Sequence, residues 1–148
     1  NGFDLSDSKD KKIAIVAGGI GIAPLLYLAK TLETKADFFA GFTYDPYFVD
    51  ELKPYVKSIS YASYKNDGKL VTDLFDPNDY DIIYACGPNP MLKAIHEKNK
   101  KAKIQVSMEA HMACGIGACL GCTVENASHD FIRVCKDGPV FDSKEVFG

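Results

Sequence analysis

The sequence predicts an α/β fold in which a five-stranded parallel sheet is followed by a small cysteine-rich module. Short apolar segments alternate with amphipathic ones over residues 12–108, a rhythm that is typical of strands joined by helical crossovers. The apolar segments lack a polar–apolar alternation, as do strands that are covered on both faces. The character changes from residue 109 on, because four of the five cysteines fall within residues 114–135. We therefore expect a linker over residues 1–11, an α/β domain over residues 12–108 and a module over residues 109–148.

Five segments are expected to form the parallel sheet, since each is short, largely apolar and bounded by polar or turn-forming residues. They are residues 12–17, 36–42, 58–62, 81–85 and 104–108. A helix is expected after the first segment, with Pro24 in its first turn and apolar residues at the spacing of one helix face. A second helix is expected over residues 89–101, with Met91, Ala94 and Ile95 facing inward.

The composition excludes several classes of function. Of the 148 residues, 47% are hydrophobic and 25% are charged, as in ordinary globular proteins. The formal net charge of -3 offers no basic surface for nucleic acid or an acidic membrane. No apolar run approaches the roughly 20 residues that span a bilayer, and the first residues lack the features of a signal peptide. Clustered cysteines without a leader favour a reducing compartment, so we expect a cytoplasmic location.

The cysteine cluster has the spacing of an iron–sulfur site. Its four cysteines, separated by four, two and twelve residues, are Cys114, Cys119, Cys122 and Cys135. The first two gaps match the plant-type ferredoxin spacing for a [2Fe–2S] cluster. Gly115, Gly117 and Gly121 are expected to permit the left-handed turns that wrap such a loop around the cluster. Structural zinc is the alternative, but zinc sites favour two C-x2–4-C pairs and only one such x2 pair is present. His111 lies close to this loop and is expected to be exposed.

A glycine-rich loop follows the first predicted strand and precedes a helix, the position of a dinucleotide phosphate loop. Its motif departs from GxGxxG, because Pro24 stands where the third glycine is expected. The residues that we expect to contact the nucleotide are Gly18, Gly19, Gly21, Ile22, Ala23 and Pro24. A tight strand-to-helix turn without a ligand is the alternative.

A second turn, CGPNPM, follows the fourth predicted strand. Since ligands of open α/β sheets bind beyond the carboxyl ends of the strands, Cys86, Gly87, Pro88 and Met91 are expected to lie beside the nicotinamide. Cys86 is either part of the catalytic environment or a small buried residue.

The residues after the second predicted strand bear on the choice of nucleotide. Asp45 is either a partner of the ribose or a turn residue before a proline. No lysine or arginine follows that strand until Lys53. A 2′-phosphate would require such a cation, so NAD is favoured over NADP.

The two predicted sites together imply a third cofactor. A nicotinamide exchanges two electrons as a hydride, whereas a [2Fe–2S] cluster accepts one. A flavin can connect them, yet no convincing flavin site is present in the sequence. We therefore expect FAD to be bound mostly by a domain that precedes residue 1, with residues 1–11 as the linker from it.

Four stretches, GGIGIAPL, CGPNPML, SMEAHMACGIGACLGC and RVCKDGPVFDSKEV, together resemble the electron transfer subunit of NAD-dependent dihydroorotate dehydrogenase. This family belongs to the ferredoxin–NADP reductase superfamily. The resemblance implies an FAD-binding β-barrel, a nucleotide domain of the ferredoxin reductase type and a [2Fe–2S] module. The sequence resembles the last two, so this fragment alone is expected to be inactive.

The resemblance also implies a partner and an electron path. The partner is an FMN-containing catalytic subunit that oxidises dihydroorotate in pyrimidine biosynthesis, within a hetero-oligomer. Electrons pass through the cluster and FAD to NAD. Glu109 and Cys86 are implied as catalytic residues, beside the flavin and the nicotinamide. Two alternatives stay open: another NAD(P)H-linked flavin and iron–sulfur reductase subunit that serves ferredoxin or sulfide chemistry, and a non-catalytic zinc-stapled nucleotide-binding module.

Overall fold

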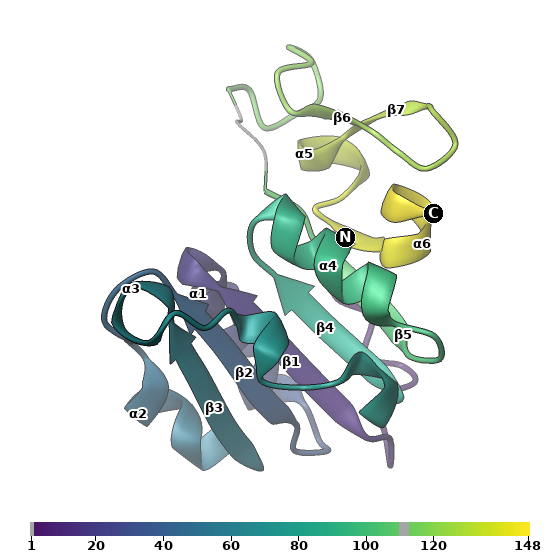
Figure 1. Cartoon of the computed structure of the whole chain (residues 1–148). Coiled ribbons are helices and arrows are strands. Elements are labelled where there is room, and N and C mark those ends of the chain that lie inside the picture. The colour runs from purple at the N-terminus through teal and green to yellow at the C-terminus, as the bar shows by residue number, and fades with distance from the viewer. Residues whose placement is uncertain (1, 110–112) are drawn as a thin grey trace.

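The computed structural model describes residues 2–109 and 113–148 and places a six-stranded sheet at the centre of the chain (Figure 1). The strand order is β3-β2-β1-β4-β5-β8. The strands are β1 (Ile13–Gly18), β2 (Asp37–Phe42), β3 (Ser58–Ser63), β4 (Ile82–Cys86), β5 (Lys103–Ser107) and β8 (Val140–Asp142). The first five pair in parallel, as predicted, while β8 pairs antiparallel with β5 and was not predicted.

The remaining elements are short, apart from two helices of ten residues each, α1 (Ile22–Thr31) and α4 (Asn89–Lys98). The shorter helices are α2 (Val49–Leu52), α3 (Tyr64–Asp67), α5 (Val134–Asp137) and α6 (Ser143–Phe147). Turns of 3-10 helix cover Gly19–Gly21, Lys53–Tyr55, Val71–Asp73 and Pro77–Asp79. A separate hairpin pairs β6 (Thr123–Glu125) with β7 (Phe131–Arg133).

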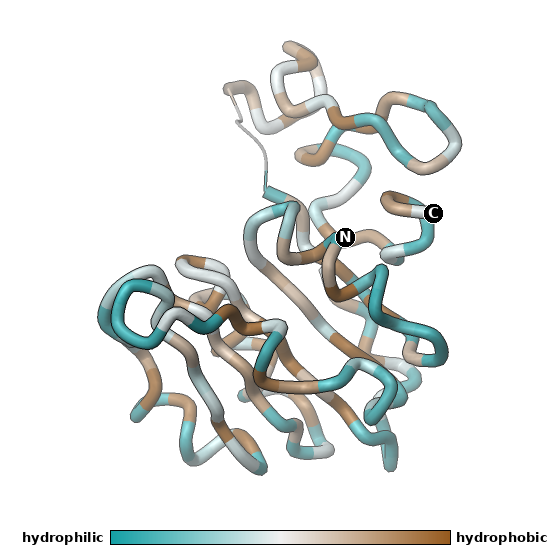
Figure 2. The backbone as a smooth tube through the Cα atoms, in the orientation of Figure 1, coloured by the Kyte–Doolittle hydropathy of each residue, from teal (hydrophilic) through white to brown (hydrophobic). Residues whose placement is uncertain are grey.

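Both faces of the sheet are covered, which explains why its strands lack a polar–apolar alternation. Alternate residues of β1 enter two separate cores, with Ile15 on the face of α1 and Val16 on the face of α4. Figure 2 shows the hydrophobic residues along the strands and hydrophilic residues in the loops at the lower edge of the sheet. In the part of the chain that the structure describes, no helix is long and apolar enough to cross a membrane.

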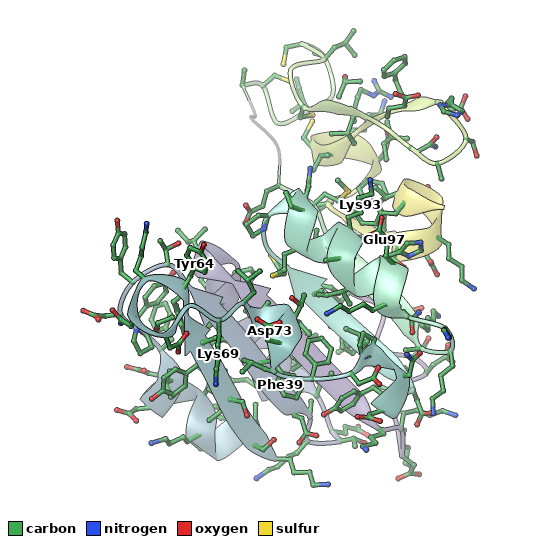
Figure 3. All side chains as sticks on the ribbon, viewed as in Figure 1. Phe39, Tyr64, Lys69, Asp73, Lys93 and Glu97 are labelled. Atoms are coloured by element: carbon green, nitrogen blue, oxygen red, sulfur yellow. The ribbon has the colours of Figure 1, made fainter. Side chains whose placement is uncertain are left out.

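Helix α4 ends at Lys98 and not at residue 101 as predicted, and its buried residues also differ from the prediction. Its fully buried residues are Leu92 and Ile95, while Met91 and Ala94 are half-buried and line a cavity instead of the core. The opposite face of α4 carries Lys93 and Glu97, which are exposed and stand on its outer side in Figure 3. The helix therefore forms a wall of the cavity as well as covering the sheet.

The cysteine-rich region shares its core with the α/β part. Strand β8 pairs Phe141 with Val106 of β5, and the Met108 amide donates to the Pro139 carbonyl at 2.9 Å. Helix α6 packs beside α4 (Figure 1), where His96 Nδ1 lies 2.9 Å from Ser143 Oγ. The predicted division at residue 109 therefore separates segments that belong to one sheet.

Residues near the N-terminus pack against the sheet. The Asp4 amide donates to Gln105 Oε1 at 2.7 Å, and Gln105 Nε2 donates to the Asp4 carbonyl at 2.8 Å. The Tyr84 hydroxyl donates to the same carbonyl at 3.1 Å, and the Phe3 ring lies edge-on to Tyr84 at 5.5 Å. Part of the segment that we predicted as a linker is thus held on β4 and β5.

The Gln105→Leu variant is expected to lower the free energy of unfolding by about 1–3 kcal/mol, because it leaves the Asp4 amide without its buried partner. Urea denaturation measures the loss, and faster hydrogen exchange at Asp4 locates it. Lys103→Gln is the matched control, since the ion pair of Lys103 with Asp7 is largely exposed and contributes roughly 0–1 kcal/mol. Equal losses in both variants would contradict the prediction.

Candidate functional site

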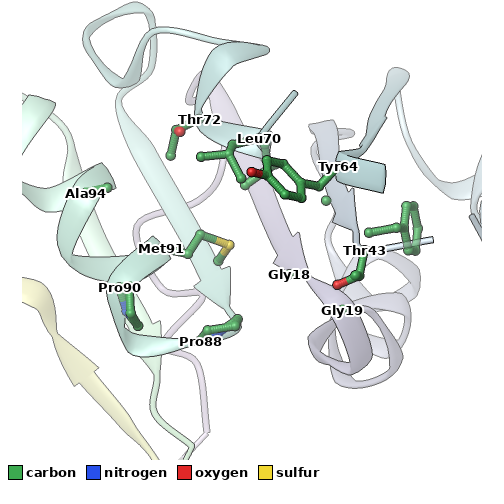
Figure 4. Close-up of a pocket in the computed structure, with 13 residues that line it drawn as sticks. Gly18, Gly19, Thr43, Tyr64, Leu70, Thr72, Pro88, Pro90, Met91 and Ala94 are labelled. Carbon is green, nitrogen blue, oxygen red and sulfur yellow. The ribbon is translucent and has the colours of Figure 1, made fainter. Parts of the chain in front are cut away.

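A cavity of about 400 Å³ opens at the carboxyl edge of the parallel strands (Figure 4). Its walls come from the ends of β1 and β2, the segment after β3 and the turn after β4. The lining residues are Gly18, Gly19, Gly41, Phe42, Thr43, Tyr64, Leu70, Val71, Thr72, Pro88, Pro90, Met91 and Ala94. This is the edge where open α/β sheets bind their ligands.

Close packing explains the glycines beside this cavity. A Cβ on Gly18 would lie 2.7 Å from Met91 Sδ, and a Cβ on Gly87 would lie 2.7 Å from Met91 Cε. A Cβ on Gly21 would overlap the backbone carbonyl of Cys86. The glycine loop and the CGP turn can therefore meet only because three of their positions carry no side chain.

The predicted nucleotide residues separate into three groups. Those that line the cavity are Gly18, Gly19, Pro88 and Met91. Those that are buried beneath it are Gly21, Ile22, Cys86 and Gly87. Ala23 and Pro24 are exposed in the first turn of α1, whose N-terminus has neither a side-chain cap nor an acidic residue. An uncapped helix start of this kind favours an anion such as a pyrophosphate.

The sequence did not reveal the far wall of the cavity. Gly41, Phe42 and Thr43 end the strand beside β1, and their place could have been inferred from the order of the parallel strands. The wall from Tyr64 to Thr72 has no motif of its own and is brought there by the pairing of β3 with β2. Asp45 does not line the cavity, since its carboxylate accepts from Asn66 Nδ2 at 3.2 Å in the loop outside.

The four predicted cluster ligands come from the loop that precedes β6 and from α5. Cys122 Sγ lies 3.2 Å from Cys135 Sγ, and the Cys135 amide donates to Cys122 Sγ at 3.4 Å. Cys114 Sγ accepts from the amides of Ile116 and Cys119 at 3.4 and 3.5 Å. The cysteines therefore meet as two pairs, Cys114 with Cys119 and Cys122 with Cys135.

Backbone turns in this loop differ in one place from the prediction. Gly115 and Gly117 have positive φ values of 71° and 81°, as expected. Gly121 was expected to do the same, but Leu120 takes the left-handed conformation instead, with φ of 62°. The Leu120 carbonyl accepts from the Thr123 hydroxyl at 2.7 Å, and the Gly121 amide donates to Cys119 Sγ at 3.4 Å. These two bonds hold the turn at Leu120.

The pairing bears on which metal group the loop can hold. Among residues 2–109 and 113–148, no three His, Cys, Asp or Glu side chains converge as ligands of a single metal ion. A tetrahedral zinc ion needs all four ligands around one point. A [2Fe–2S] cluster spreads four cysteines over two irons, so two thiol pairs with amides directed at their sulfurs fit the cluster better than zinc. His111 lies outside the described residues.

Comparison with known proteins agrees with this geometry. Residues 109–147 match the family model of the iron–sulfur cluster binding domain of dihydroorotate dehydrogenase B. The chain is 44% identical to the electron transfer subunit of dihydroorotate dehydrogenase B (NAD(+)) from Clostridium perfringens, over 99% of this chain and 63% of that protein. The chain is thus similar to these electron transfer subunits over almost all of its own residues. The resemblance seen in the sequence is thereby confirmed.

Further relatives extend the match. The electron transfer subunit of dihydroorotate dehydrogenase B from Caldanaerobacter subterraneus subsp. tengcongensis is 42% identical over 99% of this chain and 62% of its own length. The chain thus spans about three fifths of the length of these relatives. A solved structure of an NADH-dependent reduced ferredoxin–NADP oxidoreductase aligns with a TM-score of 0.76 and 30% identity, over 91% of this chain and 53% of that one. The α/β fold of the ferredoxin reductase type is confirmed.

Cys86 is a buried thiol with 4% of its surface exposed. Burial raises its pKa, a hydrogen bond with Ser107 opposes that shift, and the Glu109 carboxylate adds to it. The strand register places Ser107 directly beside Cys86. The thiol is therefore protonated and uncharged near pH 7, and Glu109 is exposed close to it.

The thiols of the cysteine loop respond to their surroundings in opposite directions. Amides of Cys119, Ile116 and Ala118 lower the pKa of Cys114 to about 6. The amide and the thiol of Cys135 lower the pKa of Cys122, while the pKa of Cys135 is raised because its proton is shared with Cys122. The loop thus stabilises the thiolates of Cys114 and Cys122, and the thiolate is the form that binds metal.

In the metal-free protein, Cys114 is expected to react with iodoacetamide at a rate that reaches half its maximum near pH 6. Its lowered pKa makes the thiolate dominant above that pH, and the thiolate is the nucleophile. Mass spectrometry of peptides after short pulses at different pH values measures the rate. Cys86 is the internal control and stays unmodified until the chain unfolds. A half-maximum for Cys114 near pH 8.5, the ordinary value for a free thiol, would refute the prediction.

Proposed function

We propose that the protein acts in the electron transfer subunit of a dihydroorotate dehydrogenase. In this proposal it passes electrons from an FMN catalytic subunit, through a [2Fe–2S] cluster and FAD, to NAD in pyrimidine biosynthesis. The observation that carries the proposal is that four cysteines meet as two pairs within residues 109–147. This is the segment that matches the iron–sulfur domain. The cavity at the carboxyl edge of the same sheet supports the nucleotide half of the activity.

The four cysteines and the loop amides would hold the cluster, which supplies storage of a single electron when it is bound. Cys114 and Cys119 are proposed to bind one iron, and Cys122 and Cys135 the other. The amides of Ile116 and Gly121 donate to sulfurs of the first pair, and the amide of Cys135 to a sulfur of the second. These donors spread the negative charge that the sulfurs carry.

The cavity residues would bind and orient NAD. The start of α1 and the adjoining Gly18 and Gly19 are proposed to receive the pyrophosphate, because that helix start is uncapped. Pro88 and Met91 are proposed to border the nicotinamide, with Cys86 beneath them. Since the Cys86 thiol stays neutral near pH 7, it places no charge under the ring.

FAD is proposed to be bound mainly by a separate domain of the full-length protein. The proposal rests on electron count, because a hydride carries two electrons and the cluster accepts one. Glu109, exposed near Cys86, is proposed to lie at the edge of the flavin. The relatives' greater length is consistent with a further cofactor-binding domain in those proteins.

The test begins with the full-length protein, purified without air. Iron and acid-labile sulfide in equal amounts, with a rhombic EPR signal on reduction, are the expected results. Mixing with the catalytic subunit should then give NAD reduction that depends on dihydroorotate, with NADP as the weaker acceptor, because no lysine or arginine lines the described cavity. Stoichiometric zinc in a colourless protein would refute the proposal. It would favour a non-catalytic module that is stabilised by structural zinc.

A second function has one observation in its favour. The solved relative is named a reduced ferredoxin–NADP oxidoreductase and is 30% identical, so the chain could serve another flavin and iron–sulfur reductase. The electron donor that the protein accepts distinguishes the two functions. Electron transfer from reduced ferredoxin to the nucleotide, with none from dihydroorotate and its catalytic subunit, would select the second.

An apolar surface around the cysteine loop is proposed to meet the catalytic subunit. Ile116, Leu120 and Phe131 are 75%, 61% and 74% exposed, which is unusual for such large apolar side chains grouped beside one site. The names of the relatives describe them as subunits, and electron transfer requires the cluster to approach its donor. These three residues are therefore the proposed contact.

The Phe131→Asp variant is expected to lower dihydroorotate-dependent NAD reduction at least about tenfold, as for loss of an interface hot spot. Its cluster EPR signal should be unchanged, because Phe131 is not a ligand. Tyr27→Asp is the control, since Tyr27 is 72% exposed on α1 at a different site. Full activity of Phe131→Asp with the catalytic subunit would argue against this surface.

A further inference from the structure

Arg133 connects the β6–β7 hairpin to the cysteine loop. Its Nη1 donates to the Gly117 carbonyl at 3.0 Å. Its Nε lies 3.7 Å from Asp137 Oδ2, and the same carboxylate oxygen accepts from the Arg133 amide at 2.7 Å. The side chain is only 31% exposed. The guanidinium is thus held by Asp137 of α5 on one side and binds the Gly117 carbonyl of the cysteine loop on the other.

Gly117 is the point where the loop lies against α5. It has a positive φ of 81°, and a Cβ there would lie 2.7 Å from Lys136 Cδ. Its amide is directed at Cys135, and the amide of the next residue, Ala118, is directed at Cys114. Gly117 therefore lies between the two cysteine pairs. Its own amide is directed at one pair, and the amide of Ala118, which follows its carbonyl, is directed at the other.

The carbonyl that Arg133 binds belongs to the same peptide group as the Ala118 amide. Fixing this carbonyl fixes the direction of that N–H toward Cys114, because the peptide group is planar. A charged donor on the carbonyl also polarises the peptide and strengthens the hydrogen bond at its other end. The Arg133 contact therefore acts on the sulfur through one rigid unit.

We propose that Arg133 is a positioning residue that sets the reduction potential of the cluster by holding the Gly117–Ala118 peptide group between the two cysteine pairs. The inference rests on the proposed [2Fe–2S] site. On reduction the cluster gains a negative charge, so amide donors and a nearby cation stabilise the reduced form more than the oxidised one. Removal of the guanidinium lowers the potential and changes the electronic environment of the sulfurs.

A neighbouring cation provides a matched control. Lys136 follows the ligand Cys135, carries the same charge as Arg133 and is exposed. Its aliphatic chain contacts Gly117, whereas the loop carbonyl is held by Arg133. Lys136→Gln therefore removes a charge close to the cluster and leaves the Arg133 contact in place, whereas Arg133→Gln removes both the charge and the contact.

The experiment measures EPR-monitored redox titrations of the full-length protein as wild type, Arg133→Gln and Lys136→Gln. We expect Arg133→Gln to keep its iron and sulfide and to weaken the preference for the reduced cluster about tenfold, which is about 59 mV for one electron. Its EPR g values should shift. Lys136→Gln should show a clearly smaller change in potential with wild-type g values.

The outcomes separate this inference from the function on which it rests. A wild-type protein without iron and sulfide refutes the proposed cluster itself. A wild-type cluster whose potential and g values respond equally to Arg133→Gln and Lys136→Gln, or to neither, overturns the role of Arg133 alone. If Arg133→Gln fails to retain the cluster, Arg133→Lys decides. Lysine keeps the charge and loses the planar fork, so g values and a potential equal to wild type in Arg133→Lys also overturn the proposal.

Discussion

The Cys122→Ser variant is expected to lose the cluster, with its visible absorption and its rhombic EPR signal. Cys122 is 3% exposed, and its sulfur lies 3.2 Å from that of Cys135, so no other side chain can take its place at that point. A serine hydroxyl is a harder donor than a thiolate and does not ionise near neutral pH. One iron would be left with a single protein ligand.

The same variant is expected to destabilise the cysteine-rich region. Cys122 belongs to the core that includes Val106 of β5 and Val134 of α5, and metal binding contributes folding free energy wherever a site is absent from the unfolded chain. Faster proteolysis within residues 113–137, with the α/β part protected, measures the effect.

Cys86→Ser is the control for this prediction. Cys86 is a buried cysteine at the end of β4, beside Ser107 and outside the thiol pairs. This variant should retain iron, sulfide and the EPR signal of the wild type. Retention of a full cluster in Cys122→Ser, or its loss in Cys86→Ser, would mean that the ligand assignment is wrong.

The Gly21→Ala variant is expected to lower the free energy of unfolding by about 3 kcal/mol and to weaken NAD binding about tenfold or more. A Cβ at this position would overlap the backbone carbonyl of Cys86. Since the obstacle is backbone, the glycine loop must move away from the CGP turn. That movement displaces Gly18 and Gly19, which line the cavity.

Gly68→Ala is the matched control, because its cost has a different origin. Gly68 has a φ of +71°, and a Cβ added there would meet nothing within 4 Å, whereas Gly21 has an ordinary φ of -58°. The control therefore suffers only backbone strain of about 1–2 kcal/mol and should bind NAD as wild type. Chemical denaturation and calorimetric titration with NAD measure both quantities. Equal losses of stability with unchanged NAD affinity in the two variants would contradict the packing argument.

Local patterns in the sequence were sufficient to locate the five parallel strands and to predict which cysteines bind the cluster. A strand of five or six buried residues between turns, such as Ile13–Gly18, can be recognised from its own run of apolar residues. The spacing of Cys114, Cys119 and Cys122 predicts an iron–sulfur loop, and in the structure Cys114 lies with Cys119 while Cys122 lies with Cys135. The left-handed turns at Gly115 and Gly117 followed from residue type alone.

Several features of the site depended on contacts between distant parts of the chain. Strand β8 has three residues, too few to show a period, and it forms because Phe141 pairs with Val106. The attachment of Asp4 to Gln105 spans 101 positions. The cavity wall from Tyr64 to Thr72 has no motif that marks it.

By itself, the sequence determined the fold class and the family resemblance, and it predicted the ligand residues of the cysteine loop. All three depend on periodicity, spacing and residue chemistry within short segments. The tertiary structure decided how the cysteines pair, that Leu120 and not Gly121 turns the loop, and where Arg133 reaches the Gly117 carbonyl. The physical reason is that hydrogen bonds and packing between distant segments form only after the chain has folded, and a local pattern carries no record of them.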